Sequence, residues 1–256
     1  MSDFRCIRYL ADYDVVRLVL ARPPLNIMTI EMMREMAAAL DEAAARPGLK
    51  ALVLSGDGKA FSTGVAVEEH VGNRAKEMLD TFHDLFRRLR ALDCVTLAAV
   101  RGAALGGGAE LATFCDVVLA ADDATFGQPE ITLGVFPPIA ALHYPRRIGV
   151  GRTLALLLSG EVIGAAEAER IGLVDRVVPA DRLADAVESQ LARFRAQSAP
   201  VLRLTKRAVR EAVGAPFEVA LSSLEDLYRY ELMATEDAAE GLRAFLERRK
   251  PVWKDR

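Results

Sequence analysis

The first two-thirds of the chain alternates between short runs that are apolar on both faces and longer stretches with helical periodicity. Between the short runs, apolar residues recur at steps of three and four, first from Thr29 to Leu40 and then from Ala75 to Leu92. Strands separated by helices in this way predict an α/β layout in which helices cover a sheet. The predicted strands span residues 15–20, 51–56, 95–100 and 117–120.

From Arg152 onward the pattern becomes almost entirely helical, and only residues 172–178 look extended. A helical tail this amphipathic must cover the body of its own subunit or contact a neighbour. We therefore predict an α/β core over residues 1–195 and a helical C-terminal region over residues 196–256. The helical patterns behind this prediction span residues 154–158, 165–171, 183–194 and 216–246.

The composition of the 256 residues is that of an ordinary globular protein, with 52% hydrophobic and 27% charged residues. The net charge of −3 speaks against a nucleic-acid partner. Cys6, Cys94 and Cys115 have neither the number for a disulfide framework nor metal-ligand spacing, so no metal is expected. Without an apolar run of about 18 residues or an apolar N-terminal stretch, we expect a cytoplasmic protein with no membrane partner.

Three stretches have the residue types of a functional site: residues 59–67, 102–111 and 126–131. In the second, Gly106, Gly107 and Gly108 open a helix, where unpaired N–H groups favour a phosphate or a developing oxyanion. The third presents Glu130 after a proline in a loop. The plainer interpretations are a glycine-rich turn, a Glu110 that complements the helix dipole and a solvated Glu130. The glycine spacing does not fit the dinucleotide fingerprint.

The combination of these motifs resembles the enoyl-CoA hydratase/isomerase, or crotonase, superfamily over nearly the whole chain. The matching segments are AFSTGVAV, GAALGGGAELATFCD, FGQPEITLG, IGLVDRVV and the C-terminal EGLRAFLERRKPVW. FSTGVAVEEH, GVFPPIAA and the segment that begins YELMATEDAAEG are most similar to cyclohexa-1,5-diene-1-carbonyl-CoA hydratases. The resemblance implies a crotonase-like spiral of ββα units with a helical C-terminal trimerisation region. It also implies a homotrimer, or a hexamer formed as a dimer of trimers.

The resemblance implies a role for individual residues. The backbone amides of Val65 and Gly107 would form an oxyanion hole, and Glu110 and Glu130 would act as the catalytic acids. In addition, Phe136 and Ile139 are hypothesised to shape an acyl pocket for a ring. The residues implied to bind CoA are Val65, Ala66, Val67, Glu68, Phe245 and Arg248, although many relatives have aspartate at position 66 and lysine is common at position 248.

The implied activity is hydration of an enoyl- or dienoyl-CoA thioester by a carbon–oxygen lyase, with no cofactor because CoA is part of the substrate. The dienoyl thioester cyclohexa-1,5-diene-1-carbonyl-CoA is one candidate substrate. Other activities on the same fold are short-chain enoyl-CoA hydration, double-bond isomerisation, decarboxylation and thioester hydrolysis. The presence of both acids favours hydration. An RNA-binding or scaffold role is a third alternative, and the net charge disfavours it.

Overall fold

The computed structural model describes residues 4–256 and contains a six-stranded sheet in the order β1-β2-β3-β5-β7-β10. The strands are parallel except for β1, which pairs antiparallel with β2. Their bounds are β1 Ile7–Ala11, β2 Val15–Leu20, β3 Ala51–Gly56, β5 Val95–Val100, β7 Val117–Ala121 and β10 Arg176–Val178. The predicted strands at 15–20, 51–56 and 95–100 are therefore confirmed. The expected extended segment at 172–178 is a strand only in its last three residues.

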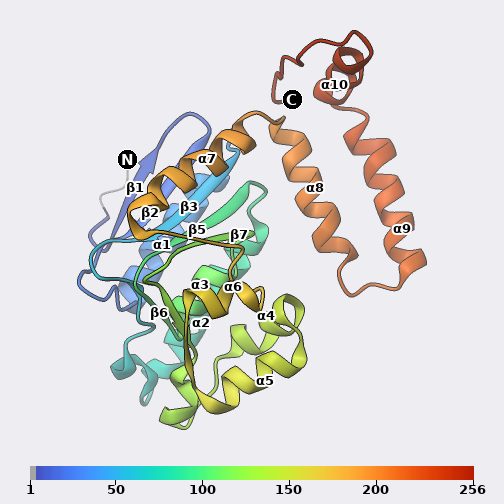
Figure 1. Cartoon of the computed structure of the whole chain (residues 1–256). Coiled ribbons are helices and arrows are strands. Elements are labelled where there is room, and N and C mark those ends of the chain that lie inside the picture. The colour runs from blue at the N-terminus through green and yellow to red at the C-terminus, as the bar shows by residue number, and fades with distance from the viewer. Residues whose placement is uncertain (1–3) are drawn as a thin grey trace.

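Both faces of this sheet are covered by helices, as the continuous apolar runs predicted (Figure 1). Helices α1 (Ile30–Ala44) and α2 (Arg74–Ala91) pack on one face. Helix α7 (Leu183–Arg195) covers the other face through Val187 and Leu191. The Thr29 hydroxyl accepts a hydrogen bond from the Met32 N–H and so caps α1 at its predicted start.

A second sheet of four short strands, in the order β4-β6-β8-β9, was not predicted. Each strand has three residues, too few to show alternation: β4 Ala60–Ser62, β6 Ala103–Leu105, β8 Thr125–Gly127 and β9 Val162–Gly164. The strand β9 contradicts the expectation that only 172–178 is extended after Arg152. The remaining core elements are η1 Val67–His70, α3 Gly107–Thr113, η2 Pro129–Leu133, α4 Pro138–Ile148, α5 Val150–Ser159, α6 Ala165–Arg170 and η3 Ala180–Arg182.

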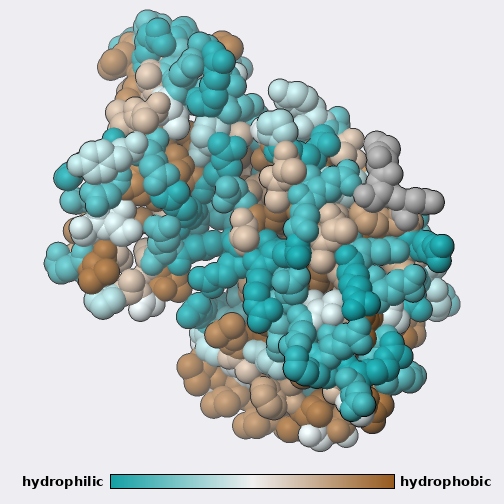
Figure 2. Space-filling view, turned by 180° about the vertical axis from the view of Figure 1, so that it is seen from behind, coloured by the Kyte–Doolittle hydropathy of each residue, from teal (hydrophilic) through white to brown (hydrophobic). Residues whose placement is uncertain are grey.

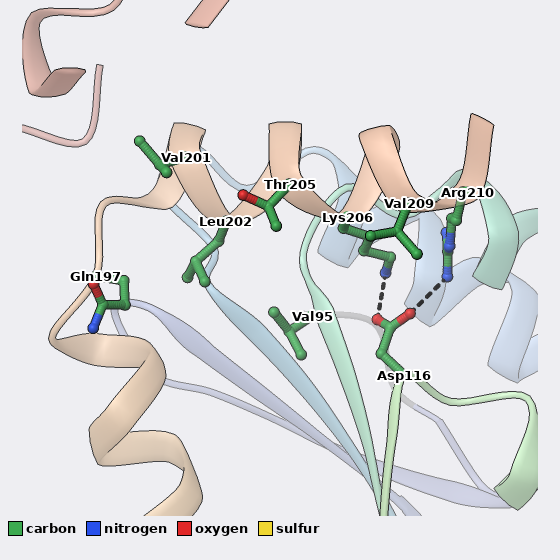
Figure 3. A pocket seen from close by; sticks show the side chains of 9 residues that line it. All are labelled: Val95, Asp116, Gln197, Val201, Leu202, Thr205, Lys206, Val209 and Arg210. Atoms are coloured by element: carbon green, nitrogen blue, oxygen red, sulfur yellow. Dashed lines mark hydrogen bonds and ion pairs between the residues drawn. The ribbon is translucent and has the colours of Figure 1, made fainter. Parts of the chain in front are cut away.

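The C-terminal helices extend away from the core, and α8 lies nearest to it (Figure 1). Asp116 joins α8 to the sheet, because its carboxylate pairs with Lys206 at 2.7 Å and Arg210 at 3.0 Å (Figure 3). The same carboxylate accepts a hydrogen bond from the Thr96 N–H. The groove around these side chains is otherwise mainly apolar, and its charged groups satisfy one another. These elements are α8 Ala199–Ala212, α9 Phe217–Asp226, η4 Leu227–Leu232 and α10 Glu236–Leu246.

Large apolar side chains are exposed in two regions. One lies on α4, α5 and the segment before them, and Figure 2 shows apolar side chains gathered at that end of the molecule. The other lies on α9 and α10, where Phe217, Phe245 and Leu246 are all more than 70% exposed. Contiguous apolar surface of this kind is typical of an interface. None of the helices within residues 4–256 combines the length and the apolar character that crossing a membrane requires.

Candidate active site

The small sheet brings the three candidate stretches together. Its strands β4, β6 and β8 are parallel, so the segments that follow them leave the same edge of the sheet. These segments are Thr63–Val65 after β4, Gly106–Gly107 after β6 and Gln128–Glu130 after β8. The stretches are up to about 60 residues apart in sequence, and parallel pairing alone makes them neighbours.

The turns at Val65 and Gly107 are in contact. A Cβ on Gly107 would lie 3.0 Å from Cγ2 of Val65, and a Cβ on Gly64 would lie 3.6 Å from the Gly107 nitrogen. Gly107 is the first residue of α3, a position at which the N–H has no partner within the helix. Gly106 has a φ of +52° and donates its own N–H to Gly127 O at 2.9 Å. The two predicted oxyanion residues are therefore adjacent.

Glu110 lies in the first turn of α3 and is 2% exposed. Its Oε1 accepts a hydrogen bond of 2.7 Å from the Ala140 N–H, and the Ile139 N–H also bonds to the carboxylate. Both donors belong to the first turn of α4, so a helix N-terminus faces the acid. Burial raises the pKa of Glu110 to about 8, the N–H donors oppose this shift and the charge of Glu130 adds to it.

Glu130 lies on the 3₁₀ helix η2, which corrects the expectation of a loop. A Cβ on Gly106 would lie only 2.6 Å from Oε1 of Glu130, so the absence of a side chain at Gly106 lets the carboxylate approach the glycine turn. Burial raises the pKa of Glu130, and the two acids interact electrostatically. Two carboxyl groups of raised pKa that influence each other can hold one proton between them, which is the arrangement that general acid–base chemistry uses.

Sequence reasoning missed three contributors to this site: the N-terminus of α4, Gln128 and Tyr144. Gln128 and Tyr144 are each 1% exposed, and the Gln128 amide lies between Tyr144 and Glu130. The signal for the helix was Pro137-Pro138, because Pro138 is the first residue of α4 and proline is favoured there.

The residues expected to shape the pocket and bind CoA have different surroundings. Phe136 is 69% exposed, whereas Ile139 is buried in the first turn of α4. Ala66 is buried and donates its N–H to Met28 O at 2.9 Å, while Val67 and Glu68 are exposed on η1.

The two tail residues that were implied to bind CoA do not reach these turns within the subunit. Phe245 is the penultimate residue of α10, and Arg248 follows that helix with a φ of +54°. Figure 1 places α10 far from α3. The predicted contribution of Phe245 and Arg248 to a site would therefore have to come through a neighbouring subunit.

One cluster among residues 4–256 has possible metal ligands, namely Cys6, Glu31 and Glu35, whose ligand atoms lie within 4.8 Å of one another. The Glu35 carboxylate accepts from the backbone amides of Arg5 and Cys6, and burial raises the pKa of the Cys6 thiol. A protonated thiol and an engaged carboxylate are poor ligands, and the cluster lies just before β1 and on α1 rather than at the glycine turns.

The raised pKa of Glu110 has a consequence for stability. The folded state keeps a proton on Glu110 that the unfolded state loses above about pH 4.5, so between pH 4.5 and about 8 the free energy of unfolding falls as pH rises. The free energy of unfolding falls by at most about 1.4 kcal/mol per pH unit through this one group.

We expect Glu110→Gln to lose less stability than the natural protein between pH 5 and 7.5 in urea unfolding. Glu161→Gln, at an exposed position, is the control, and equal pH dependences for all three proteins would contradict the assignment.

Solved structures and the geometry above define the class of protein: an α/β enzyme with the crotonase fold. Enoyl-CoA hydratase subunit I from Geobacillus kaustophilus superposes with a TM-score of 0.93, at 36% identity and 100% coverage of both chains. An enoyl-CoA hydratase from Bacillus anthracis gives 0.92 at 28% identity, covering 98% of this chain and 100% of the other. These likenesses confirm the predicted fold class.

The chain belongs to the enoyl-CoA hydratase/isomerase family, whose model matches residues 11–256. It is 42% identical over 248 residues to the cyclohexa-1,5-dienecarbonyl-CoA hydratase of Thauera aromatica, covering 96% of this chain and 95% of the relative. It is 37% identical over 247 residues to the 2,3-dehydroadipyl-CoA hydratase of Escherichia coli, covering 94% and 96%. The resemblance and the prediction of an enoyl-CoA hydratase-type lyase are confirmed.

Proposed function

We propose that this hydratase adds water to a cyclic dienoyl-CoA thioester, cyclohexa-1,5-diene-1-carbonyl-CoA, with Glu110 and Glu130 as its catalytic acids. The observation that carries the proposal is the pair of carboxyl groups, one buried and one half-buried, beside the Gly106–Gly107 turn. The relative from Thauera aromatica supports the choice of the ring substrate, since it carries that activity in its name.

The backbone amides of Val65 and Gly107 bind the thioester oxygen. When water adds to a double bond conjugated with the thioester, negative charge develops on this oxygen. Two fixed N–H donors, one of them at the start of α3, stabilise that charge without having to reorganise. The contact between the two turns supports this role, because both amides must reach the same atom.

Glu110 and Glu130 handle the water molecule and the proton. The hydroxyl of water bonds to the ring carbon at the end of the conjugated system, one carboxylate accepts the remaining proton of that water, and a carboxylic acid delivers a proton to carbon. Atoms and charge balance when the pair begins and ends the cycle with one proton between them. The raised pKa of both groups supports a shared proton near neutral pH.

The chemistry needs no cofactor, because CoA is carried by the substrate. We further propose that the subunits form a trimer, in which Phe245 and Arg248 of α10 and the segment after it reach the CoA of a neighbour. The large exposure of Phe245 and the separation of α10 from α3 support this arrangement (Figure 1). The division at residue 195, the pairing of trimers into a hexamer and the cytoplasmic location stay predictions.

A panel of thioesters tests the proposed substrate. We expect loss of the dienoyl-thioester absorbance of cyclohexa-1,5-diene-1-carbonyl-CoA at a kcat/KM at least about tenfold above those for hydration of crotonyl-CoA and a branched enoyl-CoA. Release of free thiol would indicate thioester hydrolysis instead. A higher kcat/KM with crotonyl-CoA would contradict the ring substrate and leave hydration itself intact.

A variant tests the acyl pocket with the same panel. Phe136→Ala removes an exposed ring, so we expect the fold to persist and the preference for the cyclic thioester over crotonyl-CoA to fall about tenfold, the scale of one lost apolar contact. Tyr13→Ala, at an exposed aromatic residue between β1 and β2, is the matched control. An unchanged preference in Phe136→Ala would remove Phe136 from the pocket.

A further inference from the structure

The side chain of Gln128 lies between the Glu130 carboxyl group and the Tyr144 hydroxyl, and it has two ways of bonding to them. In one orientation the amide nitrogen donates to Tyr144 Oη at 2.8 Å, but the amide oxygen faces the Glu130 carboxyl group and has a donor only when that group is protonated. In the other, the amide nitrogen donates to Glu130 Oε2 at 3.2 Å and Oε1 at 3.3 Å, and the amide oxygen accepts from Tyr144 at 2.8 Å. A half-turn of the amide exchanges the two.

Each orientation suits one protonation state of Glu130. An ionised carboxylate can only accept hydrogen bonds, so it requires the amide nitrogen. A protonated carboxyl group donates through its O–H, so it can face the amide oxygen. An ionised carboxylate that faced the amide oxygen would place two acceptors against each other. Gln128 and Tyr144 are each 1% exposed, so water cannot reach the amide to relieve this mismatch.

The Tyr144 hydroxyl can follow either orientation because it has a second partner. Tyr144 also bonds to the Thr113 side chain, whose own hydroxyl donates to Ala109 O at 2.7 Å. With Glu130 protonated, its O–H donates to the Gln128 amide oxygen and the Gln128 amide nitrogen donates to Tyr144. Tyr144 then donates to Thr113, and Thr113 donates to Ala109 O. With Glu130 ionised, Tyr144 donates to Gln128, and Gln128 donates to Glu130.

We infer that Gln128 is a positioning residue whose amide turns over as Glu130 gains and loses its proton, so that both states of the acid are hydrogen-bonded during turnover. The inference rests on the proposed role of Glu130, because an acid that delivers and recovers a proton must be stable in both states. A fixed donor would favour only the ionised form, and a fixed acceptor only the protonated form.

The charged groups around Glu130 bear on any pH measurement. Glu110 faces it from α3, where the charge of Glu130 raises the pKa of Glu110, and Tyr144 faces it from α4. Helix α5, which packs on η2, carries one charged residue, Arg152, and that guanidinium donates to Ile171 O. Since Glu110 and Glu130 titrate together, their apparent pKa values belong to the pair.

Gln128→Met tests the inference, because it keeps the length of the side chain and removes both donor and acceptor. The ionised form of Glu130 loses the stronger, charge-assisted bond, so we expect the acidic limb of the pH profile of kcat to move up by about 1 pH unit. Gln197→Met, at an exposed position, is the control. A loss of kcat that is equal at every pH would show a merely structural role and overturn the inference.

Nuclear magnetic resonance of the intact protein tests the same point without that variant. The chain has three glutamines, at 128, 190 and 197, so labelled side-chain amides give few signals. In the Glu110→Gln background, we expect the Gln128 amide protons to contact Tyr144 at low pH and Glu130 at high pH. They should not switch when Glu130 is also replaced by glutamine.

The possible results separate the two proposals. Amide contacts that stay the same while Glu130 titrates would overturn the inference about Gln128 and leave the proposed function standing. Full activity of Glu130→Gln would instead overturn the proposed function.

Discussion

Replacing either Glu110 or Glu130 with glutamine lowers the rate of hydration by at least about 100-fold, the scale of lost general acid–base catalysis. Glutamine keeps the size and hydrogen-bonding capacity of each side chain but cannot exchange a proton. Stopped assays with a dienoyl-CoA measure kcat, and calorimetry with a saturated acyl-CoA measures binding, which we expect to be retained. A rate close to that of the natural protein in either variant would refute the paired-acid mechanism.

A control for these two variants is an acid outside the proposed site. Glu161→Gln changes an exposed acid just before β9 and leaves Glu110 and Glu130 in place. We expect it to keep kcat within about twofold, as is usual for a surface change away from the reacting atoms. A loss of 100-fold in Glu161→Gln as well would mean that the assay reports overall charge rather than acid–base chemistry.

Gly107→Pro is expected to lower kcat about 10²- to 10³-fold relative to Gly107→Ala, because proline removes the N–H that we propose binds the thioester oxygen. Proline is tolerated at the first position of a helix, which is the position of Gly107 in α3. Alanine is the matched control, since both variants place a Cβ 2.9 Å from Phe82 Cζ and 3.0 Å from Val65 Cγ2. Equal rates for the two would show that this N–H does not stabilise the transition state.

The centre of the larger sheet could be predicted from sequence because β2, β3 and β5 are each six residues long and mostly buried. The apolar runs at 15–20, 51–56 and 95–100 match β2, β3 and β5 residue for residue. Helix α1 was equally accessible, since Thr29 provides a capping signal in addition to the periodicity. Helix α8 lies within the region 196–256 that was predicted to be helical, although no individual helical pattern was assigned to residues 199–212.

The site was predicted less completely, for a physical reason. The glycine run and the acid after proline were visible as local motifs, but their meeting depends on β4, β6 and β8, which are too short to show a period. The donors to Glu110 are backbone amides of Ile139 and Ala140, and a backbone group leaves no mark in the residue types. Gln128 was passed over because a lone glutamine signals nothing until Glu130 and Tyr144 lie on either side of it.

The most direct measurement is a crystal structure of the Glu130→Gln variant with a bound dienoyl-CoA. The thioester oxygen should lie within about 3 Å of both the Val65 and the Gly107 nitrogen. One water molecule should touch both Glu110 and the side chain at position 130, next to the conjugated bond. A thioester oxygen that meets neither amide, or two side chains that share no water, would contradict the account.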